Sequence, residues 1–185
     1  MTTTATSFTR MDLSTKEHWD RIAEASVQSW ADVPDRVLGL LDGLQHITNG
    51  FAVNQLVHCL QTASRAERAG ADDEVVVASL CHDIGKAVSD ANHPAVAAEM
   101  LTPFVRSDVA WMVRVHQDFQ GRHYYAYFDK DPQAREQYRD HPAYDLAERF
   151  ADEWDQTSFD PDYPTLPLEH FEPLVRKIFA TPNRI

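Results

Sequence analysis

Four histidines and one aspartate stand in parts of the sequence that are otherwise apolar. His58, His82, His93 and His116 each lie in or beside an apolar segment of helical period, and Asp83 directly follows His82. Any one of these histidines alone would more often be a hydrogen-bonded core residue than a metal ligand. Burying all five groups costs free energy unless each finds a partner, and the charge of Asp83 needs a cation or an arginine. One metal centre satisfies them all, so the sequence predicts a metal site.

A further carboxylate ligand is expected from a later helix, in the segment HPAYDLAERFADEWDQTSFD. Its apolar stripe, at steps of four residues, consists of Leu146, Phe150 and Trp154. On a helical wheel Asp155 lies nearer this stripe than Asp152 does, which favours Asp155 as the inward-facing ligand. Asp160 and Asp162 fall in the following loop and are weaker candidates.

The predicted ligands are thus four imidazoles and two carboxylates, with no cysteine among them. His82 and Asp83 are consecutive, so on a helix their side chains diverge by about 100° and serve one site only near a helix end, which Gly85 supplies. With two oxygens, Asp83 is the natural bridge between two metal ions. Such ligands suit iron, manganese, cobalt or zinc, and either hydrolysis or oxygen activation is feasible at the centre.

Several residues near these ligands are candidates for contact with a substrate. Lys86 follows the bridging aspartate by one turn and is the first cation able to face an anion, although at a helix C-terminus it is equally well a surface lysine. Lys86 and Asp83 are the predicted catalytic residues. Gln120 and Arg122 stand four and six residues after the last of the four histidines. Tyr125 belongs to the run HYYAYF, whose aromatic faces suit a quaternary ammonium group but more often pack in a core.

The remaining histidines and the cysteines carry no such pattern. Surface positions are expected for His18, His46, His123, His141 and His170, which occupy polar or terminal stretches. Cys59 and Cys81 do not form the framework of a disulfide-rich secreted domain, and we interpret both as small buried thiols.

The elements that must position these residues are helices. Segments with helical period cover 14–30, 32–47, 51–69, 72–83, 93–105, 107–119, 141–155 and 168–180. Ser14 and Glu17 have the spacing of a capping box at the start of the first segment. The valines of EVVVASL also fit a strand, but the flanking signals are helical and the sequence has no partner strand. The sequence therefore predicts an all-α fold of about eight helices, a single compact bundle with the metal site in its core.

The domain boundaries follow from the same pattern. Residues 1–12 are rich in threonine and are expected to form a flexible tail, with one domain over 13–185. The first helical segment carries an apolar stripe of Trp19, Ile22, Ala23 and Val27. The second segment is expected to bury Val37, Leu40, Leu41 and Leu44.

Charge and hydropathy exclude several classes of partner. The 185 residues carry a formal charge of −12 and have no long basic run, so we expect no nucleic acid partner. The longest apolar stretch is much shorter than a membrane span, and the N-terminus lacks the apolar segment of a signal peptide. We therefore expect a cytoplasmic protein without membrane contact.

The order of His58, then His82 and Asp83, then a late aspartate resembles the HD-domain superfamily of helical metalloproteins. CHDIGK matches the central motif of that superfamily, and the resemblance covers roughly residues 50–179. Most members are phosphohydrolases. The intervening His93 and His116 make the set similar to the dinuclear branch, which contains both cyclic-nucleotide phosphodiesterases and mixed-valent diiron oxygenases. HCLQTASRAERAGADDE and WMVRVHQDFQGRHYY look similar to the small hydroxyphosphonate oxygenases of this branch and, more distantly, to myo-inositol oxygenase.

This resemblance implies a pair of iron ions, Fe(II) and Fe(III), with O2 as co-substrate and a small anionic hydroxyphosphonate as substrate. It assigns His58, His82 and Asp155 to the substrate-chelating iron, His93 and His116 to the other, and Asp83 to both. The alternative is a metal-dependent phosphohydrolase or phosphodiesterase. One feature departs from the branch, because HITNGFAVNQLVH lacks the Tyr and Glu that help to close the open iron in some members.

Overall fold

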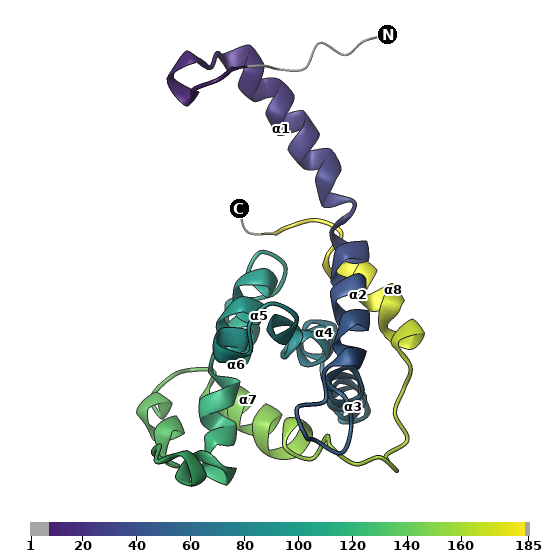
Figure 1. The fold of residues 1–185 in the computed structure, drawn as a ribbon, viewed down its shortest axis with the longest axis vertical. Helices are drawn as coiled ribbons and strands as arrows, with labels where there is room; N and C mark the ends of the chain where they lie inside the picture. Colours follow the sequence, from purple (N-terminus) through teal and green to yellow (C-terminus); the bar gives the residue numbers. More distant parts are fainter. Residues whose placement is uncertain (1–7, 184–185) are drawn as a thin grey trace.

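The structure, a computed structural model, describes residues 8–183, and all regular secondary structure in that range is helical (Figure 1), which confirms the predicted all-α class. Its α-helices are α1 (Lys16–Trp30), α2 (Val33–Gly43), α3 (Gln55–Arg68), α4 (Asp73–Cys81), α5 (His93–Leu101), α6 (Ser107–Gln120), α7 (Tyr144–Arg149) and α8 (Leu168–Ile178). Short 3-10 turns lie between many of them, and a π-helical segment, Phe150–Asp155, continues α7. Of the predicted tail, residues 1–7 lie outside the described range, and Met11–Leu13 form a 3-10 turn.

The first helix begins one residue later than its capping pattern predicts. Thr15 is the N-cap, and its hydroxyl accepts a hydrogen bond from the backbone of His18, whose ring in turn accepts one from the backbone of Thr15. Ser14 is engaged elsewhere, because its hydroxyl donates to the carbonyl of Met11 and accepts from the indole of Trp19. The expected capping box of Ser14 and Glu17 is therefore wrong by one position.

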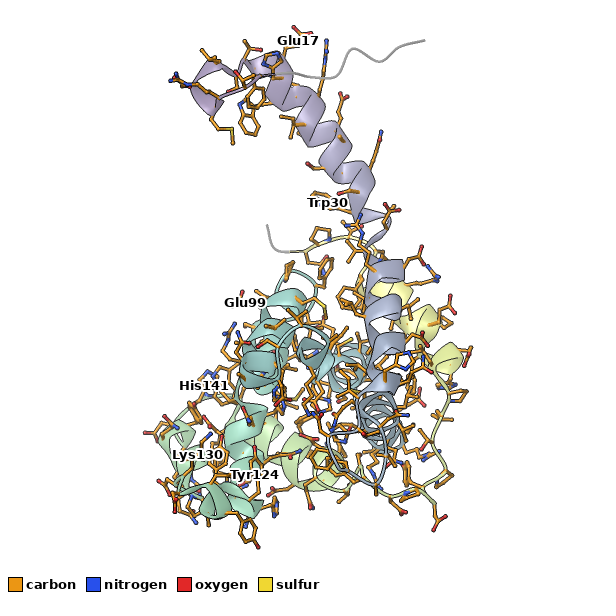
Figure 2. The ribbon with its side chains drawn as sticks, in the orientation of Figure 1. Glu17, Trp30, Glu99, Tyr124, Lys130 and His141 are labelled. Carbon is orange, nitrogen blue, oxygen red and sulfur yellow. The ribbon has the colours of Figure 1, made fainter. Side chains whose placement is uncertain are left out.

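Helix α1 projects from the rest of the molecule, and none of its residues is buried (Figures 1 and 2). Its apolar stripe is left open to solvent, with Trp19 43% and Val27 54% exposed. Leu41 in α2 and Leu44 in the 3-10 turn that follows it are buried as expected, whereas Leu40 in α2 is 38% exposed. The helical body thus begins at α2, and the domain start at residue 13 stays a prediction.

The core is organised around α4. Helix α3 packs on α4 and on the π-helical segment, α5 packs on α6, and α8 covers α2 and α4. All residues of α4 from Val75 to Cys81 are buried. A helix buried on every side has no polar face, which is why this stretch also fitted a strand by sequence. Its C-terminal end, in the centre of the body, carries His82.

The two cysteines are free and fully buried, as expected. Burial raises the pKa of the Cys59 thiol and that of the Cys81 thiol, so both stay protonated and unreactive. In residues 8–183, every helix is too short or too polar to cross a membrane.

Candidate metal centre

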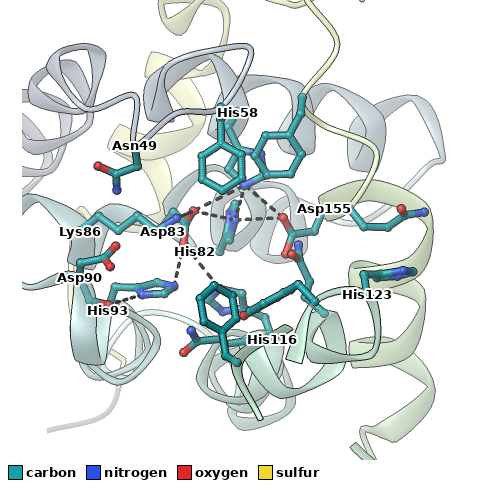
Figure 3. A pocket seen from close by; sticks show the side chains of 17 residues that line it. Asn49, His58, His82, Asp83, Lys86, Asp90, His93, His116, His123 and Asp155 are labelled. Atoms are coloured by element: carbon teal, nitrogen blue, oxygen red, sulfur yellow. Dashed lines mark hydrogen bonds and ion pairs between the residues drawn. The ribbon is translucent and has the colours of Figure 1, made fainter. Parts of the chain in front are cut away.

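Six buried side chains from five parts of the fold converge on one point in the core (Figure 3). His58 comes from α3, His82 and Asp83 from the end of α4, His93 from the first turn of α5, His116 from α6 and Asp155 from the end of the π-helical segment. These are the six residues that the sequence singles out as ligands. Ligand atoms of five of them form two overlapping clusters, one of His58, His82 and Asp155 and one of His82, Asp83 and His116, each within 4.8 Å, and His93 joins the second through its contact with Asp83.

The first group of atoms surrounds the Nε2 atoms of His58 and His82, which lie 3.0 Å apart. Asp155 Oδ1 is 3.1 Å from the first of these nitrogens and 3.3 Å from the second. Asp83 Oδ2 faces the same two nitrogens at 3.5 and 3.6 Å. Two imidazoles and two carboxylates therefore point at one position.

The second group forms around the other oxygen of Asp83. Asp83 Oδ1 is 3.0 Å from His93 Nε2 and 3.5 Å from His116 Nε2. The two oxygens of one carboxylate thus face two different sets of histidines. This is the geometry that a carboxylate bridge between two metal ions requires.

All four histidines are held in the same tautomer. In each ring Nδ1 donates a hydrogen bond to a backbone carbonyl, which fixes the orientation of the ring. In the order of the chain the acceptors are the carbonyls of Ser158, Ser79, Asp90 and Val113, at 2.9, 2.8, 2.8 and 2.7 Å. Each Nε2 therefore points at the centre, and a neutral ring presents its lone pair there.

This arrangement fits a bound cation. Asp83 Oδ1 and both oxygens of Asp155 are buried without a hydrogen-bond donor in the described chain. Lone pairs of nitrogen and oxygen would face one another across 3.0 to 3.6 Å with only protons available to separate them. Metal ions satisfy all of these atoms, and nitrogen and oxygen ligands without thiolate suit iron, manganese, cobalt or zinc.

The π-helical segment decides which late aspartate points inward. The backbone N–H of Gln156 donates to the carbonyl of Ala151 at 3.1 Å, the five-residue spacing of a π-helix. π-Turns of this kind occur often at functional sites. Asp155 is fully buried at the centre, whereas Asp152 accepts hydrogen bonds from Arg122 and Arg135 on the outer side.

The charges of the centre are strongly coupled. Burial opposes ionisation of Asp83 and Asp155, but the adjacent histidines outweigh it, and the pKa of each carboxyl lies well below its usual range. Burial likewise opposes protonation of His82, yet the two carboxylates outweigh it and raise its pKa to about 8. Burial lowers the pKa of His116. Without metal, His82 therefore carries the proton that balances the carboxylates.

Between pH 6.5 and 8 the metal-free protein is expected to lose stability while metal binding strengthens. The folded pKa of His82, about 8, lies above the ordinary value of 6.5, so its contribution is complete below pH 6.5 and is lost as pH rises through 8. The loss amounts to about 2 kcal/mol. Both carboxylates stay ionised across this window, and His116 is neutral there.

Scanning calorimetry of metal-loaded protein, and of protein stripped of metal with a chelator, measures both effects across this pH range. As pH increases, the Tm of the metal-free protein should fall, and the rise in Tm on adding metal should grow. A Tm of the metal-free protein that increases from pH 6.5 to 8 would contradict the assignment of the proton to His82.

Gly85 allows the backbone of His93 to lie close to the chain that carries Asp83. A Cβ atom at Gly85 would lie 2.3 Å from the carbonyl oxygen and 2.7 Å from the Cα of His93. Because these are backbone atoms at the start of α5, no side-chain rotation relieves the clash. The absence of a side chain therefore allows His93 to approach Asp83.

Gly85→Ala is expected to displace His93 and to weaken metal binding on its side of Asp83. Overpacking of this kind lowers the free energy of unfolding by about 1–3 kcal/mol. Gly39→Ala in α2 is the matched control, because its Cβ would meet nothing within 4 Å. That control should stabilise the helix by about 0.5–1 kcal/mol. Metal content and thermal unfolding of the two variants test this, and equal metal content in both would rule out the proposed spacing role.

A cavity of about 640 Å³ opens onto the six residues (Figure 3). Lys86 lies in its wall, and its ammonium donates to Asp83 Oδ2 at 2.6 Å and to Gln55 Oε1 at 3.0 Å. In residues 8–183, Lys86 is the one lysine or arginine that lines this cavity. It is thus the cation available to an anion that enters.

Of the other three predicted substrate contacts, one lines the cavity and two do not. Gln120 lines the cavity, but Arg122 and Tyr125 do not. Arg122 pairs with Asp152 at 3.0 Å, and the hydroxyl of the buried Tyr125 donates to Asp118 at 2.8 Å. After α6 the chain continues as short 3-10 turns, which present Tyr124 to the cavity in place of its neighbour. The offset from His116 therefore does not bring Arg122 to the cavity, and Tyr125 is buried, as aromatic residues of such a run more often are.

Several wall residues escaped the sequence analysis. Asn54 caps α3 through its hydrogen bond with the backbone of Val57, so the helix begins at Gln55 and not near residue 51. The freed loop contributes Asn49 and Phe51 to the wall, in the stretch that lacks the Tyr and Glu of related oxygenases. The remaining wall residues that sequence did not assign to the site are Asp90, Gln117, His123, Tyr124, Phe128, Gln156 and Phe159. None stands in a periodic pattern, and only the aromatic run around residue 125 gave a signal.

Comparison with known proteins agrees with this geometry. The HD domain family matches residues 56–160, which is more than half of the chain, so the chain belongs to the HD domain family. Members of this family are generally metal-dependent enzymes. A search of curated proteins finds no significant match. Family and cluster together indicate a metal-dependent enzyme whose buried His and Asp residues are able to hold metal.

Proposed function

We propose that this protein is a mixed-valent diiron oxygenase that cleaves the C–P bond of a small 1-hydroxyalkylphosphonate. In the overall reaction, R–CH(OH)–PO3H2 and O2 give R–COOH and phosphoric acid, so that both oxygen atoms of O2 enter the products. The two irons, when bound, supply the redox chemistry. The substrate would bind in the cavity with its hydroxyl toward the metal centre.

The observation that carries this proposal is the shared carboxylate of Asp83. One of its oxygens faces His58 and His82, and the other faces His93 and His116. A single ion would leave part of this set unused. Two adjacent ions with nitrogen and oxygen ligands are suited to hold a chelating substrate and dioxygen within reach of each other.

The side chains of the cavity wall suit a small zwitterionic substrate. The Lys86 ammonium retains one N–H beyond its bonds to Asp83 and Gln55, and it would donate this to a phosphonate oxygen. Burial raises the pKa of Tyr124, so its hydroxyl stays protonated as a donor. The aromatic side chains of Phe51 and Phe128 would accommodate a trimethylammonio group.

The same wall argues against a nucleotide or polyphosphate substrate. Such a substrate needs several cations, and within the described chain Lys86 is the sole lysine or arginine of the wall. Arg122, the other candidate, is paired with Asp152 instead. This favours the oxygenase over the alternative, a metal-dependent phosphohydrolase.

The test combines spectroscopy with a substrate assay. Protein reconstituted with Fe(II) and then oxidised by one electron per iron pair, for example with limiting O2, should show the EPR and Mössbauer signals of a coupled Fe(II)/Fe(III) pair. In a closed cell, 1-hydroxy-2-(trimethylammonio)ethylphosphonate or 2-amino-1-hydroxyethylphosphonate should then release phosphate in proportion to the O2 consumed. Phosphate release from esters without O2, in protein lacking the coupled signal, would instead identify a phosphohydrolase.

A further inference from the structure

Helix α3 carries two buried glutamines with different surroundings. Gln61, 1% exposed, uses both ends of its amide, donating to the carbonyl of Asp160 at 2.7 Å and accepting from the N–H of Asp160 at 3.3 Å. Gln55, 0% exposed, accepts from the Lys86 ammonium, but its Nε2 has no acceptor in the described chain. One glutamine is fully paired and the other is not.

The unpaired nitrogen of Gln55 is a consequence of its contact with Lys86. An ammonium group has donors only, so the amide must turn its oxygen toward Lys86. A flipped amide would place two donors against each other. An unpaired buried donor lowers stability, whereas a methionine of similar size would leave none. The sequence therefore retains at position 55 a group that is less stable than an apolar one but that accepts a hydrogen bond from Lys86.

That hydrogen bond restricts a flexible side chain. Lys86 has a four-carbon stem, and without a second acceptor its ammonium is fixed by Asp83 alone. With Gln55 Oε1 at 3.0 Å and Asp83 Oδ2 at 2.6 Å, two of its three N–H groups have fixed directions. The third is thereby directed as well, and Lys86 lines the cavity. The backbone of Gln55 is itself anchored, because its backbone N–H donates to the carbonyl of Ile47 at 2.8 Å.

We infer that Gln55 is a positioning residue, whose side-chain carbonyl holds the Lys86 ammonium in the orientation that binds the anionic group of the substrate. Gln55 does not line the cavity, so it acts through Lys86 and not by contact with the substrate. The inference rests on the proposed function only in requiring an anionic substrate at Lys86. It does not depend on whether the reaction consumes O2.

The test is a double-mutant cycle with methylphosphonate as the probe. Methylphosphonate has no hydroxyl on its carbon and is not turned over by the proposed reaction, so calorimetry on the metal-loaded protein gives its Kd directly. Gln55→Met should retain the metals, keep or raise Tm and weaken methylphosphonate binding by about tenfold. In a Lys86→Met background the same change should have less than about a twofold effect, because the side chain through which it acts is gone.

Gln61→Met is the matched control, a buried glutamine on the same helix whose loss should lower Tm and leave Kd unchanged. An unchanged Kd in Gln55→Met, or equal weakening in both backgrounds, would overturn the inference. If Lys86→Met fails to hold metal, the comparison of Gln55→Met with Gln61→Met still decides it, since a purely structural role makes the two alike. If the hydroxyphosphonates cause no O2 consumption but the methylphosphonate Kd values follow the expected pattern, the oxygenase is rejected and the role of Gln55 stands.

Discussion

Asp83→Ala is expected to abolish binding of both metal ions and, with it, all turnover. Among residues 8–183, Asp83 is the carboxylate that faces both sets of histidines, through Oδ2 at 3.5 Å from His58 Nε2 and through Oδ1 at 3.0 Å from His93 Nε2. Its removal also leaves the Lys86 ammonium with Gln55 as its one hydrogen-bond partner among the residues that the structure describes. Breaking a buried charge pair on one side costs about 3–5 kcal/mol, so the variant should also be less stable.

Elemental analysis after iron reconstitution measures the first effect, and circular dichroism establishes that the variant is folded. Asp83→Asn, which keeps the volume of the side chain, serves if the alanine variant does not fold. Asp90→Ala is the matched control, because Asp90 lines the same cavity and is exposed, and only its backbone carbonyl contacts His93. Retention of two ions per chain in Asp83→Asn would refute the bridging role.

Asp155→Ala is expected to remove one ion and leave the other. Its Oδ1 lies 3.1 Å from His58 Nε2 and 3.3 Å from His82 Nε2, on the side of Asp83 away from His93 and His116. The second group keeps its two imidazoles and the facing oxygen of Asp83. Metal content should therefore fall from two ions per chain to one, with loss of the coupled EPR signal and of turnover.

Asp152→Ala separates this effect from the general loss of a carboxylate in the same segment. Asp152 pairs with Arg122 and with the buried Arg135, so its removal should lower Tm and leave both ions in place. The reverse pattern, with metal lost from Asp152→Ala and kept by Asp155→Ala, would show that the wrong aspartate has been assigned to the centre.

Much of the site could be read from the sequence because burial of polar groups is costly. Four histidines in apolar segments and an aspartate beside one of them have few ways to be satisfied, and a shared metal centre is the most economical. The helical pattern then placed the four histidines on or beside four different helices, with Asp83 directly after His82. The choice of Asp155 over Asp152 also came from periodicity, although the local helix is a π-helix and not the α-helix assumed.

The features that sequence missed depend on local departures from regular helices. Arg122 was expected in the cavity by counting along the chain from His116, and Tyr125 because it belongs to an aromatic run, but α6 ends at Gln120 and the chain turns there. Because Asn54 caps α3, the helix begins at Gln55, and the loop before it places Asn49 in the cavity wall. A capping residue or a 3-10 turn changes the direction of side chains by large angles, and composition gives little warning of it.

By itself the sequence predicted the all-α class from its helical periodicity, the metal ligands from histidines and aspartates in or beside apolar segments, and the HD family from the resemblance of its motif. Only the tertiary structure decided that the two oxygens of Asp83 face different histidines, that Gly85 lets α5 approach, and that Gln55 reaches Lys86 across 31 positions of sequence. Those relations join separate elements at distances of about 3 Å, and such distances are fixed by how the helices pack and not by the period of any one of them.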